Sequence, residues 1–245
     1  MNVYAVVQRG EYHLNTCEDH LITTTIGRDK IVCAVMDGCT NGIESHFAST
    51  LVGKLLRKIC LAEGYKELYK PSSISSPEIQ LKTILNELFR ELNITKSQLL
   101  LDEKELLTTL IILLANKQTG NGIVMAIGDG IVSINGTTTN FDQDNKPDYL
   151  GFHLDDNFDT WYNGLTQKLA FDRIHDISIA TDGIETFTRV AKPTSIDEID
   201  PIRFLTQNDD NRSNEDMLYM KLKTLEHKYG QKATDDLAMI RIINK

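Results

Sequence analysis

The feature that most restricts the fold is a series of short apolar runs that end in an aspartate. In VCAVMDG, VMAIGDG and ISIATDG, the residues Asp37, Asp129 and Asp182 each follow such a run and precede a glycine. In ATDDLAMIRI the order is reversed, and Asp235 and Asp236 precede the apolar residues. Short aliphatic and β-branched runs predict buried strands. The chain is therefore expected to contain several buried strands with carboxylates at their ends.

The spacing of apolar residues predicts the other elements. Strands are expected at residues 3–8, 21–26, 31–36, 106–115, 123–127, 131–134, 177–180 and 237–243, with the first three in a hairpin or meander. Residues 135–160 are polar and predict loops with at most short strands. These elements favour an α+β layered sandwich, and the length of 245 residues fits one domain over 1–245.

Helices are indicated by apolar residues three or four apart. The first is expected at residues 46–61, with Phe47, Leu51, Leu55 and Ile59 on the face that covers a sheet, and the second runs from Pro77 to Leu92 with Ser76 as N-cap. Helical spacing also continues through residues 184–191. A late helix around residues 218–225 has Ser213 or Asn214 as candidate caps and Gly230 as its end.

Composition excludes some classes of protein. A net charge of −9 without a basic stripe argues against a nucleic-acid binder. No window approaches the apolar length of a membrane span, and the N-terminus lacks a leader pattern. Cys17, Cys33, Cys39 and Cys60 show no CxxC spacing and are expected to be reduced. We therefore expect a cytoplasmic protein.

The aspartates allow two interpretations. Each Asp-Gly pair could be an ordinary hairpin turn. Their recurrence favours a metal site, because several carboxylates at one place are tolerated only when cations neutralise them. Oxygen ligands favour Mg²⁺ or Mn²⁺, and the six histidines form no HxH or HxxxH pair that would indicate zinc.

The order of the motifs TCEDHL, VMDGCTNG, HFAST, LLTTLIILLA, IGDG, ATDGIE and TDDLAMIRI resembles the type 2C family of metal-dependent protein serine/threonine phosphatases, in a divergent bacterial-type form. The resemblance extends from Gly10 to Ile243. It implies a four-layer αββα sandwich of two antiparallel sheets flanked by helices. It also implies a variable flap at about residues 184–212 that shapes substrate choice.

The resemblance implies a site with two metal ions, and a third, weaker one, which would be Mn²⁺ or Mg²⁺. Asp37 would bridge two ions, the Gly38 carbonyl would ligate one of them, and Asp182 and Asp235 would complete the set. Asp19 matches the early acidic pair as a ligand, and its partner Glu18 would mainly hold water. Asp129 would bind the third ion and Asp236 would support the ligands from behind. Asp37, Asp19 and Asp182 are therefore the expected catalytic residues.

The implied reaction is hydrolysis of phosphoserine or phosphothreonine on a protein by a water that two cations activate. We therefore expect a signalling phosphatase that acts on phosphoproteins. We also expect it to be a monomer and to bind neither nucleic acid nor membrane. The sequence departs from the family at Leu14, where members usually carry a phosphate-binding arginine. Arg9 and His13 are candidate replacements. Cys39 stands where many eukaryotic relatives have a histidine that is thought to protonate the leaving group, and a metal-bound water or His46 could act as the acid instead.

Three alternatives follow from these residues. A regulatory or binding module could keep the phosphatase fold with little turnover, in line with the missing arginine. An N-terminal nucleophile amidohydrolase would need Ser, Thr or Cys at a processed N-terminus, whereas Met1 is followed by Asn2 and Val3. A cysteine hydrolase that uses Cys39 has no partner histidine that the sequence places.

Overall fold

Two five-stranded antiparallel sheets pack face to face in the computed structural model, which describes residues 1–69, 76–142, 148–195 and 197–244. The first sheet has the order β1 (Asn2–Gln8), β12 (Leu237–Ile243), β9 (Asp176–Ala180), β6 (Gly130–Ile134) and β7 (Thr137–Phe141). The second has the order β2 (His20–Ile26), β3 (Lys30–Met36), β4 (Leu110–Asn116), β5 (Gly122–Ile127) and β8 (Lys168–Phe171). A short ribbon pairs β10 (Phe187–Arg189) with β11 (Gln231–Ala233).

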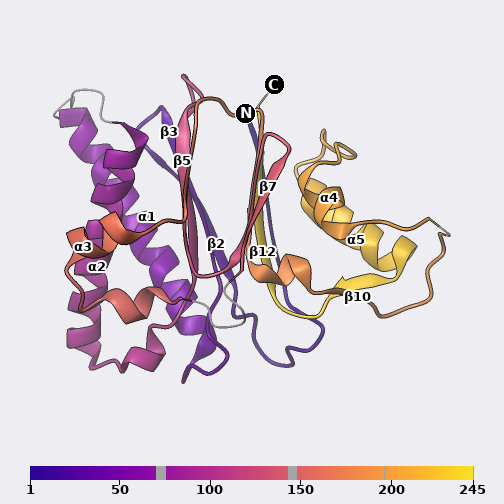
Figure 1. Cartoon of the computed structure of the whole chain (residues 1–245), viewed down its shortest axis with the longest axis horizontal. Helices are drawn as coiled ribbons and strands as arrows, with labels where there is room; N and C mark the ends of the chain where they lie inside the picture. Colours follow the sequence, from indigo (N-terminus) through magenta and orange to yellow (C-terminus); the bar gives the residue numbers. More distant parts are fainter. Residues whose placement is uncertain (70–75, 143–147, 196, 245) are drawn as a thin grey trace.

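Helices cover the outer face of each sheet (Figure 1). The second sheet is covered by α1 (Ser45–Tyr69), α2 (Pro77–Leu99) and α3 (Phe158–Gly164), and the first by α4 (Pro201–Thr206) and α5 (Met217–Tyr229). The 3₁₀ turns are η1 (Glu103–Glu105), η2 (Leu150–His153) and η3 (Asp182–Glu185). This arrangement is the predicted four-layer αββα sandwich, so the expected fold class is confirmed.

Three apolar cores hold the four layers together. One lies between the second sheet and its helices, one between the two sheets, and one between the first sheet and α4 and α5. Central strands are largely apolar because both of their faces are buried: all seven residues of β12, which include Arg241, and all six of β5 are buried. Among the described helices, none combines the length and the apolarity needed to cross a membrane.

The antiparallel registers bring distant strand ends to one end of the sandwich. Gln8 at the end of β1 lies opposite Leu237 at the start of β12, and Met239 near the start of β12 lies opposite Ala180 at the end of β9. An isolated bridge between Gly38 and Thr108 places the residues after β3 beside those before β4. The termini of the chain lie at the other end, at the top of Figure 1.

Several predicted elements are confirmed and others are wrong. The β2–β3 hairpin is correct, but β1 belongs to the other sheet, so the first three strands form no meander. The helical spacing at residues 184–191 is misleading: η3 ends at Glu185 and β10 follows, because pairing with β11 overrides the local pattern. Residues 106–109 precede β4 instead of belonging to it.

The helices also differ in detail from the prediction. Helix α2 is capped by Ser76 and buries its predicted stripe, as expected. Helix α1 buries Ala48, Val52 and Leu56, whereas Leu51 and Leu55 are only partly buried, so the face is rotated by one residue. The polar stretch 135–160 contains β7, η2 and the start of α3.

The late helix begins later than its candidate caps allow. Helix α5 starts at Met217 after Asp216, so neither Ser213 nor Asn214 is the N-cap. Asn214 instead accepts the backbone N–H of Asp216 at 2.9 Å and holds the preceding turn. Gly230 does end the helix in the left-handed conformation, with φ of 66°, as expected.

Candidate functional site

Four predicted aspartates reach the end of the sandwich that lies away from the chain termini (Figure 1). Asp19 directly precedes β2 and Asp37 directly follows β3. Asp182 opens η3 after β9, and Asp235 lies just before β12. Because the strands are antiparallel neighbours, their acidic ends meet, although they come from segments more than 200 residues apart. We call these four residues the acidic centre.

The carboxylates of the acidic centre interact directly. Burial, together with the charges of Asp19, Asp182 and Asp235, raises the pKa of Asp37 well above its usual range. After burial, the charge of the neighbouring Asp19 makes the largest contribution to the raised pKa of Asp37. Two neighbouring buried carboxylates therefore ionise together only when a positive charge compensates them.

The pKa values of Asp19 and Asp182 are also raised, in both cases to about 7 and chiefly by burial. The charge of Asp236 adds to the effect at Asp19, and those of Asp129 and Asp235 add to it at Asp182. Asp129 itself has a raised pKa because of burial and the nearby charges of Asp142 and Asp235. Asp129 thus belongs to the same electrostatic environment, as the sequence predicted for an additional ligand.

Asp19 has one satisfied oxygen and one unsatisfied oxygen. Its Oδ2 accepts a hydrogen bond of 2.6 Å from the Thr181 hydroxyl, which in turn accepts the Ala238 N–H at 2.9 Å. Its Oδ1 is buried without a hydrogen-bond partner in the described part of the chain. A buried carboxylate oxygen without a donor is costly, and a hard cation is the kind of partner that removes this cost. The donor chemistry therefore fits Mg²⁺ or Mn²⁺.

The side chains of the acidic centre are near one another but are not arranged as a set of metal ligands in the described residues. Within residues 1–69, 76–142, 148–195 and 197–244, no group of three or more His, Cys, Asp or Glu side chains has the placement that could hold a metal ion. The ligand set therefore remains a prediction that rests on proximity and donor chemistry.

Two glycines allow the backbone to close around the acidic centre. A Cβ on Gly38 would lie 1.9 Å from the Ser45 carbonyl oxygen, and a Cβ on Gly183 would lie 1.7 Å from that of Asp236. No side chain fits at either position. The glycines after Asp37 and Asp182 are thus explained by close approach of backbone segments.

Asp236 fastens the N-terminal loop to the acidic centre. Its Oδ1 accepts the Gly10 N–H at 2.7 Å, and its Oδ2 accepts the Glu18 N–H at 2.5 Å. His13 bridges the two adjacent aspartates, with Nδ1 2.9 Å from Asp236 and Nε2 3.1 Å from Asp235. Burial alone would lower the pKa of His13, but the carboxylates around it raise it overall. Asp236 therefore has a supporting position.

Glu18 points toward the loop after β3. Its Oε2 accepts a hydrogen bond of 2.8 Å from the Thr40 hydroxyl, and its backbone carbonyl accepts one of 2.6 Å from Ser49 on α1. The Asp37 backbone is held in the same way, because its N–H donates to Thr109 Oγ1 at 3.1 Å and its carbonyl accepts from Thr108 at 2.7 Å. These contacts fix the backbone on which the acidic centre stands.

The position of the missing arginine contains no replacement cation. Leu14 is 84% exposed, and Arg9 donates to the Leu14 carbonyl at 3.1 Å without any contact to an aspartate of the acidic centre. His13 does reach that centre, so it is the only one of the two candidates in contact with it among the described residues. His46 is exposed on the first turn of α1.

Sequence reasoning missed several residues that build the site. Thr181, Thr108 and Thr109 all donate to or accept from the acidic segments, and Tyr149 shares a hydrogen bond with Cys39 beside Asp37. Thr181 could have been noticed because it directly precedes Asp182 in ATDG. Tyr149 lies in a polar stretch whose pattern contains no such signal.

The comparisons with known proteins agree with this geometry. The family model described as Protein phosphatase 2C matches residues 9–222. A variant of a bacterial serine phosphatase superposes with a TM-score of 0.63 at 14% identity, covering 100% of this chain and 99% of that one. The serine/threonine phosphatase Stp1 from Staphylococcus aureus gives 0.59 at 13%, covering 100% and 96%.

A third structure is larger than this chain. The phosphatase domain and regulatory fragment of the cell fate determinant SpoIIE from Bacillus subtilis match with a TM-score of 0.55 at 16% identity, covering 98% of this chain. This chain spans 62% of that structure. No curated protein matches the chain. Because the family model covers most of the residues, the chain belongs to the protein phosphatase 2C family.

Proposed function

We propose that the protein hydrolyses phosphomonoesters in a reaction that depends on Mn²⁺ or Mg²⁺, and that its substrates are phosphoserine and phosphothreonine residues of proteins. Membership of the family supports a phosphatase in general. The observation that carries the proposal is the meeting of Asp19, Asp37, Asp182 and Asp235 at one end of the sandwich. The raised pKa values of Asp19, Asp37 and Asp182 are the signature of carboxylates that lack a compensating positive charge.

The proposed ligands are Asp19, Asp37, the Gly38 carbonyl, Asp182 and Asp235. When bound, two divalent cations would supply the Lewis acidity that activates water and neutralises charge on the phosphate. The related RsbX structure contains magnesium and superposes with a TM-score of 0.50 at 15% identity, which agrees with this choice of ion. Asp129 is proposed to hold an additional ion.

The residues behind the ligands would keep them oriented. Thr181 holds one oxygen of Asp19 and leaves the other free to turn toward a cation. His13 and Asp236 would fix Asp235, and Glu18 would orient water near the loop after β3. Partners of this kind commonly determine how well a site binds its metal.

The protein is proposed to act on phosphoproteins in cytoplasmic signalling, and the state of its cysteines supports the compartment. All four cysteines are free thiols, and burial raises the pKa values of Cys17, Cys33 and Cys60 to about 12. Thiols in this state are unreactive and suit a reducing compartment. The net charge of −9 supports a protein substrate and argues against nucleic acid.

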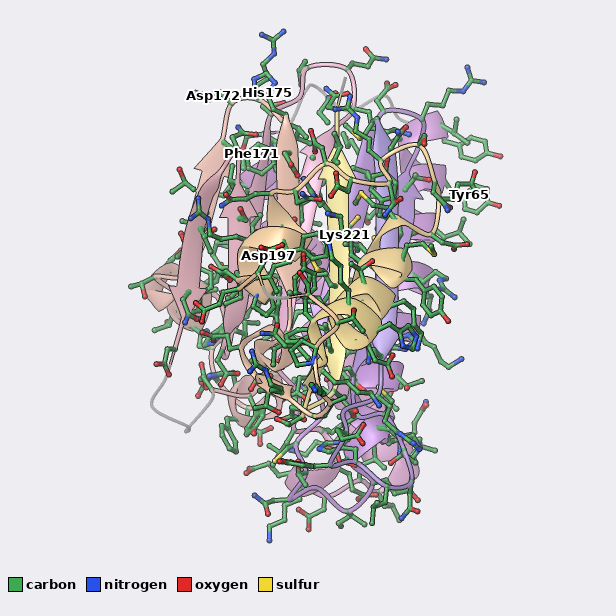
Figure 2. All side chains as sticks on the ribbon, turned by 90° about the vertical axis from the view of Figure 1, so that its right-hand side faces the viewer. Tyr65, Phe171, Asp172, His175, Asp197 and Lys221 are labelled. Carbon is green, nitrogen blue, oxygen red and sulfur yellow. The ribbon has the colours of Figure 1, made fainter. Side chains whose placement is uncertain are left out.

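The proposal is tested by hydrolysis of a small aryl phosphate and of a phosphothreonine peptide, each with Mn²⁺, with Mg²⁺ or with chelator. The unaltered protein is compared with Asp37→Asn and with the control Asp172→Asn, which removes an exposed aspartate at the other end of the sandwich (Figure 2). Metal-dependent turnover that Asp37→Asn abolishes and Asp172→Asn leaves intact supports the proposal. Turnover that persists in chelator would contradict it.

A second candidate is a binding module with the same fold and no turnover. The exposed Leu14 favours it, because the position that usually grips phosphate offers no cation there. This candidate predicts that a phosphothreonine peptide binds to the unaltered protein, that no metal induces hydrolysis, and that Asp37→Asn changes only the affinity. Calorimetry with a phosphothreonine peptide, run beside the turnover assay, separates the two.

A further inference from the structure

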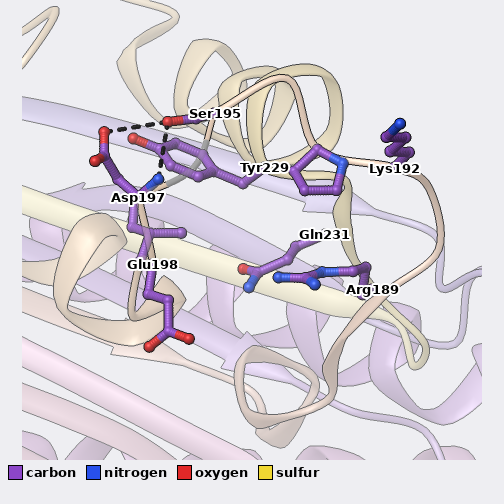
Figure 3. Close-up of a pocket in the computed structure, with 9 residues that line it drawn as sticks. Arg189, Lys192, Ser195, Asp197, Glu198, Tyr229 and Gln231 are labelled. Carbon is purple, nitrogen blue, oxygen red and sulfur yellow. Dashed lines mark hydrogen bonds between the residues drawn. The ribbon is translucent and has the colours of Figure 1, made fainter.

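A polar pocket of about 540 Å³ lies beside the β10–β11 ribbon, on the segment expected to form the flap (Figure 3). Its lining includes Arg189 at the end of β10, Gln231 at the start of β11 and Tyr229 at the end of α5. The loop after β10 contributes Lys192 and Glu198. The volume lies within the range of pockets that bind small molecules or side chains of a partner.

Arg189 and Gln231 each leave polar atoms of their side chains unused within the described chain. The Arg189 side chain is exposed and forms no hydrogen bond or ion pair with any described residue. Gln231 Oε1 is buried and accepts no hydrogen bond from them. The two residues are directly paired across the ribbon, so their side chains leave the same stretch of backbone, and Figure 3 shows both extending into the pocket. A guanidinium presents a fork of donors that matches a carboxylate.

The wall of the pocket is held in place by backbone hydrogen bonds. Val190 N–H donates to the Gly230 carbonyl at 2.8 Å, and Thr194 N–H donates to that of Lys228 at 2.9 Å. A Cβ on Gly230 would lie 2.2 Å from the Ala191 carbonyl oxygen, so the loop and the end of α5 are in close contact. Opposite Arg189, Asp197 Oδ2 accepts a hydrogen bond of 3.1 Å from the Ser195 hydroxyl. The pocket is therefore built before any ligand arrives.

The ribbon connects the pocket to the acidic centre. At its inner end, the Asp235 N–H donates to Thr186 Oγ1 at 3.1 Å. Arg189 lies three residues beyond Thr186, and Gln231 lies four residues before Asp235. At about 3.3 Å per extended residue, the pocket is roughly 10 to 13 Å from the acidic centre. An extended peptide covers this distance in three or four residues.

We propose that this pocket binds a glutamate or aspartate side chain of the phosphoprotein substrate, three or four positions from the phosphorylated residue. The inference rests on the proposed phosphatase function and adds a substrate preference to it. Arg189 would bind the carboxylate with two hydrogen bonds, and Gln231 Oε1 would accept an N–H of the substrate backbone. Glu198, which also lines the pocket, would weaken the attraction and restrict it to a single acidic side chain.

The test uses phosphothreonine peptides that carry Glu or Gln at the third or fourth position on either side of the phosphorylated residue. The readout is the ratio of kcat/KM for the Glu peptide to that for the matching Gln peptide. We expect a ratio of about 10 in the unaltered protein, a ratio near 1 for Arg189→Ala and a higher ratio for Glu198→Gln. The control Arg173→Ala, an exposed arginine beside Asp172 at the other end of the sandwich, keeps the original ratio.

The two levels of the proposal fail differently. Hydrolysis of a small aryl phosphate by the unaltered protein reports the acidic centre alone, because that substrate does not reach the pocket. Equal rates for Glu and Gln peptides in a protein that hydrolyses aryl phosphate would overturn the pocket assignment only. If no substrate is hydrolysed, fluorescence anisotropy of the labelled Glu and Gln peptides bound to Asp37→Asn still tests the pocket assignment. Equal affinities for the two peptides, or a preference for the Glu peptide that Arg189→Ala retains, would overturn that assignment.

Discussion

The protein buries charged side chains in two regions, and only one of the two regions provides them with partners. At the acidic centre, Asp19, Asp37 and Asp182 face like charges and keep raised pKa values. On the outer face of the first sheet, Arg241 and Lys221 are each 0% exposed and fully surrounded by acceptors. Lys221 belongs to α5, one of the helices that cover this face (Figure 2).

The buried cations form a network that needs no external ion. Arg241 donates to both oxygens of Asp176 at 2.9 and 2.6 Å and to the carbonyls of Leu205 and Asn208. Lys221 donates to the Phe204 carbonyl and to both the carbonyl and the side chain of Asn208. Burial and the charge of Arg241 lower the pKa of Lys221 to about 8.

The difference between the regions separates a structural role from a functional one. The cationic network provides an acceptor for each donor of its buried charges and so holds the segment between α4 and α5 against β12. The acidic centre leaves Asp19 Oδ1 without a partner and accumulates negative charge. Buried charges without partners cluster at functional sites, because structure alone gives no reason to keep them.

The largest expected effect is on turnover. In Asp37→Asn, metal-dependent hydrolysis should fall by at least about 1,000-fold, since bound metals supply several kcal/mol and about 1.4 kcal/mol corresponds to a factor of ten. Steady-state rates with an aryl phosphate measure it. An Asp37→Asn enzyme within tenfold of the unaltered one would show that the acidic centre is not the catalytic site.

The cationic network should govern stability and leave metal dependence alone. Arg241→Met removes both hydrogen bonds to the Asp176 carboxylate and one each to the Leu205 and Asn208 carbonyls, and should lower the free energy of unfolding by about 3 to 5 kcal/mol. Urea denaturation in chelator measures this loss. The matched change Arg173→Met, at an exposed position, should cost less than about 0.5 kcal/mol. Equal losses in the two variants would remove the distinction between the regions.

The metal-free protein should become less stable as pH rises from about 4 to about 7. Asp19 and Asp182 hold their protons up to a pKa of about 7 when folded but release them near 3.8 when unfolded, so the folded state binds more protons in this window. One independent group would give about 1.4 kcal/mol per pH unit, and the coupling between neighbouring carboxylates spreads the titration over a wider pH range and lowers the slope per group. Denaturation in chelator at several pH values measures the slope. Asp19→Asn should flatten it.

His13 is expected to have the smallest effect. His13→Ala removes the bridge between Asp235 and Asp236 and should weaken Mn²⁺ binding by about tenfold, the lower end for residues that orient a ligand. Calorimetric titration with Mn²⁺ measures it. His175→Ala, at an exposed site at the far end, is the control. An unchanged affinity in His13→Ala would leave His13 a purely structural contact.

Local chemistry explains which features could be predicted from the sequence. Strands such as β3, β9 and β12 are largely apolar, and the aspartates at their ends are visible without coordinates. Helix α2 carries its own cap at Ser76. The sheet to which β1 belongs depends on pairing with β12 at the other end of the chain, and no local pattern encodes that pairing.

The same limit applies to the site. The carboxylates were predictable as residue types at strand ends, but the hydroxyl of Thr181, the bridge made by His13 and the pocket beside Arg189 depend on contacts across the fold. At residues 184–191 the periodicity favoured a helix, and the tertiary pairing of β10 with β11 gave a strand instead. Prediction fails where long-range contacts override local preference.

The account depends most directly on a cation binding at the acidic centre, and thermal unfolding at pH 7.5 with increasing Mn²⁺ tests this. The account predicts that Tm of the unaltered protein rises steadily with Mn²⁺, because a ligand that binds only the folded state stabilises it. It also predicts that Asp37→Asn starts from a higher Tm in chelator, with its repulsion relieved, and gains almost nothing from Mn²⁺. If Tm of the unaltered protein does not change with Mn²⁺, or if it rises equally in Asp37→Asn, cation binding at the acidic centre is contradicted.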